Sequence, residues 1–115
     1  EYIAHGFTAS DNFRHLDTMY CLVGHTHVPF VFEEADVMAN ESYLGHGDSL
    51  LLGDQRLIIN PGGVGQPRDR DARASYAIYD SQAEIIYHYR VEYDIQATQR
   101  KMLRYFSNAV IEIIA

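Results

Sequence analysis

Short apolar runs separated by turn residues dominate the hydrophobic pattern of this chain, which is typical of strands rather than long helices. Residues 19–23 form a continuous apolar run with turn signals on both sides, which predicts a strand buried on both faces. An extended aromatic and β-branched pattern resumes at residues 29–32. Two more short strands are expected at residues 50–52 and 57–59, around a turn at Gly53 and Asp54.

The second half of the chain predicts a hairpin and then a helix. Residues 76–79 and 85–93 read as two strands joined by a turn at 80–83. The second strand alternates, so its apolar odd-numbered side chains should face the core. Its polar face, which includes His88 and Arg90, should lie at the surface. We expect the tyrosines at 76, 79, 87, 89 and 93 to pack across strands.

Helical spacing places one apolar stripe on the helix after Asp94, formed by Ile95, Met102, Leu103 and Phe106. The apolar tail at 110–115 ends without a capping residue, so the chain is expected to continue.

The first third of the chain predicts an extended run at residues 2–4 that ends at His5, followed by a short helix at 12–16 with N-cap residues at 10–12. Residues 33–49 lack periodicity and are predicted to be a variable loop with room for a short hairpin. Together these elements favour an α/β or α+β sandwich.

Composition narrows the class of protein. The chain has 115 residues, about one domain, and its 47% apolar and 22% charged content is typical of a globular protein. No apolar run approaches the roughly 20 residues that a membrane span requires. The net charge of −7 disfavours a nucleic-acid polymer as partner. The single cysteine, Cys21, reads as a small core residue, which favours a reducing, cytoplasmic setting.

The most informative residues are the histidines of Gly24-His25-Thr26-His27, at the end of a predicted strand. Side chains two residues apart in extended backbone share a face, whereas a bend at Gly24 would direct the two rings to different metal ions. Neutral imidazole binds divalent transition metals well. His5 ends the preceding predicted strand, so all three histidines are expected at one edge of the sheet.

A glycine-rich loop follows the strand predicted at 57–59, in the sequence INPGGVGQPR. Glycines allow the backbone to approach a ligand, and exposed N–H groups can bind an anion. Gly63 and Arg68 are therefore candidates for contacts with a phosphate group.

These motifs occur in the order of a known enzyme family. GHTHVPF resembles the closing GHxH motif of the calcineurin-like metallophosphoesterases, and the earlier AHG resembles their preceding histidine–glycine motif. The segment INPGGVGQPRDRDARASYAIYD is similar to the NPGSVGQPR block of the small YfcE-like and diadenosine-tetraphosphatase-related phosphoesterases. The resemblance runs from His5 to the helix near Phe106, and residues 33–49 are unmatched in detail.

The resemblance implies a β-sandwich flanked by helices, of which residues 1–115 would be the C-terminal half. It implies two divalent metal ions, with manganese favoured over iron, zinc or nickel. His5 and His25 would bind one metal and His27 the other. A hydroxide that bridges the metals would attack a phosphate mono- or diester.

The family's N-terminal motifs, D-x-H, G-D-x-x-D and G-N-H-[DE], are missing from the chain. The bridging aspartate, the asparagine ligand and the proton donor are therefore expected upstream, in the N-terminal half of the same domain. We expect this chain by itself to be inactive.

Two other functions fit the same residues. One is a non-catalytic scaffold for protein partners, and the other is a single structural zinc site held by the three histidines. His15 and His88 are predicted to be surface residues, while His46 could be solvated or could line the cleft. The charged run at residues 69–71 is predicted to be a solvated loop with local ion pairs.

Overall fold

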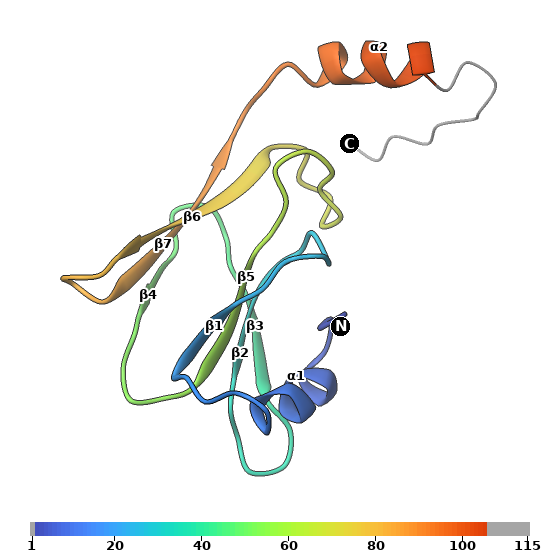
Figure 1. The fold of residues 1–115 in the computed structure, drawn as a ribbon. Coiled ribbons are helices and arrows are strands. Elements are labelled where there is room, and N and C mark those ends of the chain that lie inside the picture. Colours follow the sequence, from blue (N-terminus) through green and yellow to red (C-terminus); the bar gives the residue numbers. More distant parts are fainter. Residues whose placement is uncertain (1, 106–115) are drawn as a thin grey trace.

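The computed structural model describes residues 2–105 and folds them into two β-sheets with a helix at each end of the chain (Figure 1). The elements are, in chain order, α1 (Gly6–Phe13), β1 (Tyr20–Leu22), β2 (Pro29–Glu33), β3 (Asn40–Tyr43), β4 (Ser49–Leu51), β5 (Leu57–Pro61), β6 (Ala74–Asp80), β7 (Ile85–Val91) and α2 (Ile95–Tyr105).

The first sheet has the strand order β1-β5-β2-β3, with β1 and β5 parallel and the other neighbours antiparallel. The second sheet has the order β4-β7-β6 and is antiparallel. The apolar sequence of β5 suits a central position, because four of its five residues are buried between neighbouring strands and layers. β4 and β5 are close in sequence but lie in different sheets, so residues 52–56 cross between the layers.

Two clusters of buried side chains hold these layers together. The cluster between α1 and the first sheet includes Phe13, Phe32 and Ile58. The cluster between the two sheets includes Val31, Ile59, Leu57, Leu52 and Ile86. Neighbouring residues of β2 and β5 thus point to opposite layers, as the alternation of a strand requires. The predicted α/β class and the sandwich with flanking helix are confirmed.

α2 contrasts with the rest of the fold because none of its residues is buried. Figure 1 shows it beyond the end of β7, away from the first sheet. Ile95 and Met102 of the predicted stripe are half-buried, and Leu103 is exposed. Phe106 and residues 110–115 lie outside the described residues. Within residues 2–105, no helix has the length and apolarity that crossing a membrane requires.

The elements before β1 differ from the prediction. Residues 2–4 form no strand, and α1 begins at Gly6 and ends at Phe13, earlier than the predicted helix at 12–16. The reason is that Ser10 is not an N-cap. Its Oγ instead donates to the Gly6 carbonyl 2.9 Å away, inside the helix.

Two burial patterns also differ from the prediction. β1 is an edge strand, and Leu22 is 63% exposed, so the strand is not buried on both faces. The β6–β7 hairpin forms as predicted, but His88 and Arg90 face inward and are buried while Val91 is exposed. The prediction chose the wrong face because hydrogen bonds and ion pairs hold these inward side chains, although Arg90 Nε has no hydrogen-bond partner among the described residues. The tyrosine prediction is confirmed for one pair, Tyr76 and Tyr89, whose ring centroids are 5.6 Å apart.

Candidate metal centre

The turn after β1 carries two histidines in an unusual backbone conformation. His25 has φ 79° and His27 has φ 60°, both in the left-handed region that side chains with a Cβ rarely adopt. Thr26, between them, is buried, whereas His25 is exposed and His27 half-buried. Backbone strain of this kind is retained only where the surrounding structure imposes it, and it is common at functional sites.

A buried amide links this turn to the glycine-rich loop. Asn60, at 0% exposure, donates from Nδ2 to the Gly24 carbonyl at 3.1 Å and to Thr26 Oγ1 at 2.8 Å. Its Oδ1 accepts from the Gly62 N–H at 2.9 Å. The Gly24–His27 turn and the glycine-rich loop therefore form one hydrogen-bonded unit. The sequence prediction missed this role of Asn60 and Thr26, although both residues lie inside the two motifs.

The glycine-rich loop also contacts the ring of His27. A Cβ on Gly63 would lie 3.1 Å from the His27 Cβ, and a Cβ on Gly62, which has φ +89°, would lie 2.5 Å from Ser75 Oγ. Position 62 therefore requires glycine, whereas a side chain at position 63 would have to displace His27 by a few tenths of an ångström. His27 Nδ1 is 2.8 Å from the Gln66 carbonyl, which can only accept, so Nδ1 carries the hydrogen. In the neutral imidazole the lone pair then lies on Nε2, which is the atom available to a metal.

The N-terminal segment that carries His5 contacts the Gly24–His27 turn through Tyr2. The Tyr2 ring, three residues before His5, meets the His25 ring edge-on at 4.9 Å between centroids. His5 is the N-cap residue of α1 and not the end of a strand. The next residue must be glycine, because a Cβ on Gly6 would lie 2.3 Å from the Ala39 carbonyl oxygen.

The Gly6 N–H is also held, because it donates to Glu41 of β3 at 3.0 Å. These contacts fix the start of α1, and His5 with it, against the first sheet.

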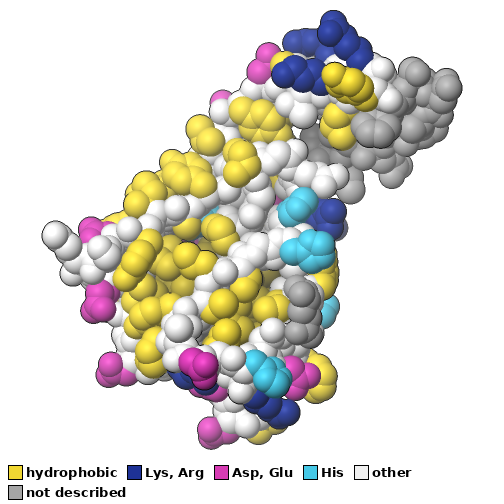
Figure 2. Space-filling view, in the orientation of Figure 1, with side chains coloured by type: hydrophobic (Ala, Val, Ile, Leu, Met, Phe, Trp, Pro, Cys, Tyr) yellow, Lys and Arg dark blue, Asp and Glu magenta, His cyan; other side chains and the backbone are white. Residues whose placement is uncertain are grey.

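Figure 1 shows the turn after β1 and the loop after β5 together on one side of the molecule, and Figure 2 shows histidine side chains exposed along that side. In residues 2–105, however, no three His, Cys, Asp or Glu side chains come close enough to hold one metal ion. Imidazole nitrogens are good donors to a divalent transition metal, but the described residues do not supply a complete set of ligands for one.

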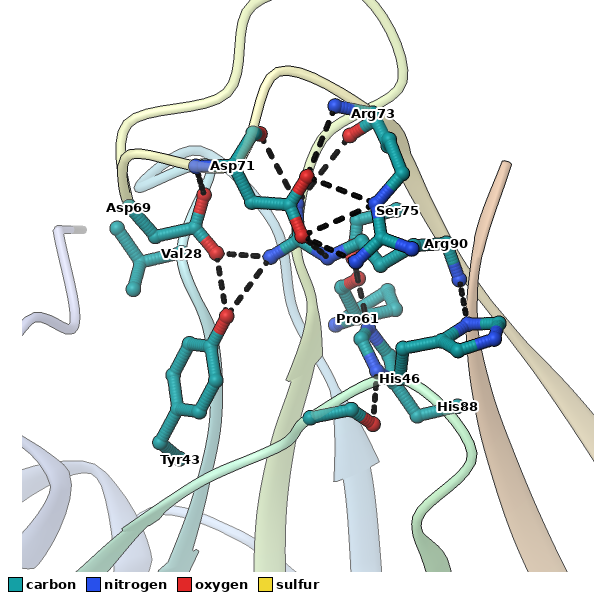
Figure 3. Close-up of polar contacts among 12 residues, drawn as sticks. Val28, Tyr43, His46, Pro61, Asp69, Asp71, Arg73, Ser75, His88 and Arg90 are labelled. Atoms are coloured by element: carbon teal, nitrogen blue, oxygen red, sulfur yellow. Dashed lines mark hydrogen bonds and ion pairs between the residues drawn. The ribbon is translucent and has the colours of Figure 1, made fainter. Parts of the chain in front are cut away.

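The segment after the glycine-rich loop is anchored to the second sheet by a buried ion pair (Figure 3). The guanidinium of Arg90 bonds to the Asp69 carboxylate, and their side chains are 1% and 4% exposed. Arg90 Nη2 also contacts the Tyr43 hydroxyl at 3.1 Å, and that hydroxyl donates to Asp69 Oδ2 at 2.7 Å. Asp69 is therefore not a solvated loop residue, and that part of the prediction was wrong.

A second, more exposed pair joins Asp71 and Arg73 at 2.6 Å. The hydrogen bond from Arg73 holds the pKa of the Asp71 carboxyl below its usual value, against a smaller opposing effect of burial. This pair is a local ion pair of the kind predicted for the charged run.

His88 lies in the interior, opposite to its predicted surface position. Its two ring nitrogens contact Ser75 Oγ at 2.7 Å and the Gly45 carbonyl at 2.8 Å, and Ser75 Oγ donates to the Pro61 carbonyl. This chain of contacts joins β7 and β6 to the end of β5, next to the glycine-rich loop. His46 is exposed, and its Nδ1 accepts from the Arg90 N–H at 2.8 Å, so that nitrogen is not available to a ligand. His15 is exposed, as predicted.

The remaining candidate, Arg68, is exposed, and no hydrogen bond or ion pair holds its guanidinium to the other residues of the described range. One cavity of about 250 Å³ lies elsewhere, between the first sheet and β4. Its lining residues are Val31, Glu33, Asn40, Ser42, Leu44, Asp48, Ser49, Leu50 and Leu57, so it contains none of the predicted site residues.

Comparison with known proteins gives the family context of this geometry. The crystal structure of a metallophosphoesterase from Sphaerobacter thermophilus superposes with a TM-score of 0.84 and is 44% identical in sequence, over 91% of this chain. The chain has the fold of a metallophosphoesterase. It covers 45% of that structure, so the match concerns one part of the larger protein.

A second relative is an uncharacterized protein, MJ0912, from Methanocaldococcus jannaschii. It is 41% identical over 95 residues, which make up 82% of this chain and 36% of the relative. No protein-family profile matches the chain. The resemblance to a metallophosphoesterase is confirmed, and the chain spans less than half the length of either relative.

Proposed function

We propose that this chain is the C-terminal part of a metal-dependent phosphoesterase, in which His5, His25 and His27 are ligands of two divalent metal ions. The observation that carries the proposal is the turn in which His25 and His27 both have positive φ, in a chain with a metallophosphoesterase fold. The substrate would be a phosphate mono- or diester, and manganese is the first metal to test, before iron, zinc and nickel.

Each candidate residue has a defined task in this proposal. His27 would bind through Nε2, because the Gln66 carbonyl occupies Nδ1. His5 and His25 would share the other metal. The backbone of Gly63 and the guanidinium of Arg68 would contact the phosphate of the substrate. Two bound divalent metals supply Lewis acidity and stabilise the charge that develops on the phosphoryl group.

The ligands that this chain lacks would come from the residues that precede it. An edge of the first sheet is open for them, because β1 pairs only with β5 among the described residues. Parallel strands are normally covered on both faces. Here Met19, just before β1, and Leu22, its last residue, are both exposed. An upstream strand could therefore extend the sheet next to the Gly24–His27 turn.

Metal analysis and one variant test the proposal on the protein that includes these upstream residues. We expect close to two metals per chain, and His27→Ala should abolish hydrolysis of an aryl phosphate ester without unfolding the protein. His15→Ala, at an exposed position of the N-terminal segment, is the matched control and should remain active. One metal per chain would instead indicate a structural zinc site, and none would indicate a scaffold.

The 115-residue chain by itself should show no turnover with added Mn²⁺. Measurable turnover would contradict the assignment of essential ligands to upstream residues.

A further inference from the structure

Asn60 uses its whole side chain to connect two segments of the candidate site. Both N–H groups of its amide are donated to the Gly24–His27 turn, and its oxygen accepts from Gly62. A neutral amide of this length is needed for that pattern, because a carboxylate has no donor and a hydroxyl has only one. At 0% exposure, water cannot replace any of these bonds.

The two donors of Asn60 bond to the residues on either side of His25. One reaches the Gly24 carbonyl and the other reaches Thr26 Oγ1. The same hydroxyl accepts from the Val28 N–H at 3.3 Å, so His27 also lies between held residues. The anchored residues alternate with the two histidines that have positive φ. This arrangement gives a physical reason for the strained conformation, since the turn cannot relax while its anchors are in place.

The oxygen of Asn60 acts on the other side of His27. By accepting from Gly62 it fixes the turn that brings Gly63 against the His27 side chain. The same loop continues to the Gln66 carbonyl, which holds His27 Nδ1. One buried amide therefore influences both the backbone and the ring of His27.

We propose that Asn60, acting through Thr26, is a positioning residue that couples the glycine-rich loop to the metal-binding orientation of His25 and His27. The inference rests on the proposed function for its metal readout. It assigns no contact between Asn60 and metal or substrate.

Three variants test this role in the protein that includes the upstream residues. Asn60→Asp keeps the size of the side chain and the acceptor for Gly62 but loses both donors. Thr26→Val removes the hydroxyl at nearly constant shape, and Thr26→Ser keeps it. Ile59→Val is the matched control, because it destabilises the neighbouring buried position of β5 without removing a hydrogen bond.

We expect Asn60→Asp and Thr26→Val to weaken Mn²⁺ binding, measured by calorimetry, by about 10- to 100-fold, the usual effect of losing a residue that orients a ligand. Thr26→Ser and Ile59→Val should bind as the unmodified protein does. A crystal structure of Asn60→Asp without metal should show that His25 or His27 has left positive φ.

The inference is overturned if Asn60→Asp and Thr26→Val bind Mn²⁺ as tightly as Ile59→Val, or if both histidines keep positive φ in Asn60→Asp. If the unmodified protein binds no metal, the proposed function fails, and the φ angles still decide whether Asn60 positions the turn. Should Asn60→Asp fail to fold, the comparison of Thr26→Val with Thr26→Ser decides the question, and equal Mn²⁺ affinities would then reject it.

Discussion

Substitution of His25 or His27 should reverse the usual stability order of alanine and glycine. At ordinary positions alanine is more stable than glycine by about 0.5–1 kcal/mol, because glycine loses more conformational freedom on folding. Left-handed backbone costs a residue with a Cβ about 1–2 kcal/mol, and glycine does not have this cost. At φ 79° and 60° the second effect is larger, so each glycine variant should be more stable than its alanine counterpart by about 0.5–1 kcal/mol.

Urea denaturation measures this difference directly. With a slope of about 2 kcal/mol per molar urea, a difference of about 1 kcal/mol moves the midpoint by roughly 0.5 M. The matched control is Val64, which is 70% exposed in the neighbouring loop and does not have positive φ. There the alanine variant should be the more stable one. Alanine at least as stable as glycine at both histidines would show that the turn is not strained, and the reasoning would fail.

The same variants separate two explanations of the histidines. A histidine present for structural reasons should lose stability in both variants, because its contacts are removed. If instead the histidine binds metal and its backbone is strained, the glycine variant should lose little stability but should no longer bind metal. Measuring Mn²⁺ binding on the stable glycine variants therefore tests function without interference from unfolding.

Three further predictions concern the surroundings of the site. Gly6→Ala should destabilise the protein by about 1–3 kcal/mol, because the new Cβ would lie 2.3 Å from a backbone oxygen, and a stabilising effect in urea denaturation would refute this packing. Arg90→Met should lower the free energy of unfolding by about 3–5 kcal/mol, because it leaves the buried Asp69 carboxylate unpaired. The double variant Arg90→Met/Asp69→Leu should be less destabilised, and an equal loss of stability in the two variants would argue against the pair. Arg73→Met should return the lowered pKa of Asp71 toward its usual value in an NMR titration of the carboxyl carbon. Because that pKa is lowered in the folded state, the pair stabilises the fold above about pH 4, and its contribution is lost as the pH falls through the lowered pKa. If the pKa of Asp71 is unchanged in the Arg73→Met variant, Arg73 is not the cause of the lowering.

The strands of this fold could be predicted where the local pattern was enough. β2, β5 and the β6–β7 hairpin lie close to their predicted positions, since short apolar runs bounded by turns are a local signal. β3 had no such signal, because all four of its residues are exposed and it forms by pairing with β2. Strands that depend on a partner in this way are found from tertiary contacts and not from their own sequence.

The buried face of β7 shows a different limit. Alternation correctly separates its residues into two faces, but it does not indicate which face is inside. The inward face carries His88 and Arg90, whose partners lie 13 to 47 residues away in the sequence. A buried polar face is stable only when each partner is in place, and hydrophobicity along one strand contains no information about those partners.

The candidate site depends both on local sequence motifs and on contacts between residues that are distant in the sequence. The pattern of glycines and histidines located His25, His27 and the glycine-rich loop, yet it treated the loop as a separate phosphate-binding element. The hydrogen bonds of Asn60 span 34 and 36 residues and join the two motifs into one unit. If that unit sets the histidine backbone, then a change in the glycine-rich loop, such as Gly62→Ala, should weaken metal binding even though Gly62 is not a ligand. The alanine Cβ would lie 2.5 Å from Ser75 Oγ, and the resulting shift would displace the backbone N–H of residue 62, which donates to Asn60 Oδ1. If a folded Gly62→Ala variant binds metal as tightly as the unmodified protein, the glycine-rich loop does not set the conformation of the histidines, and the two motifs act independently.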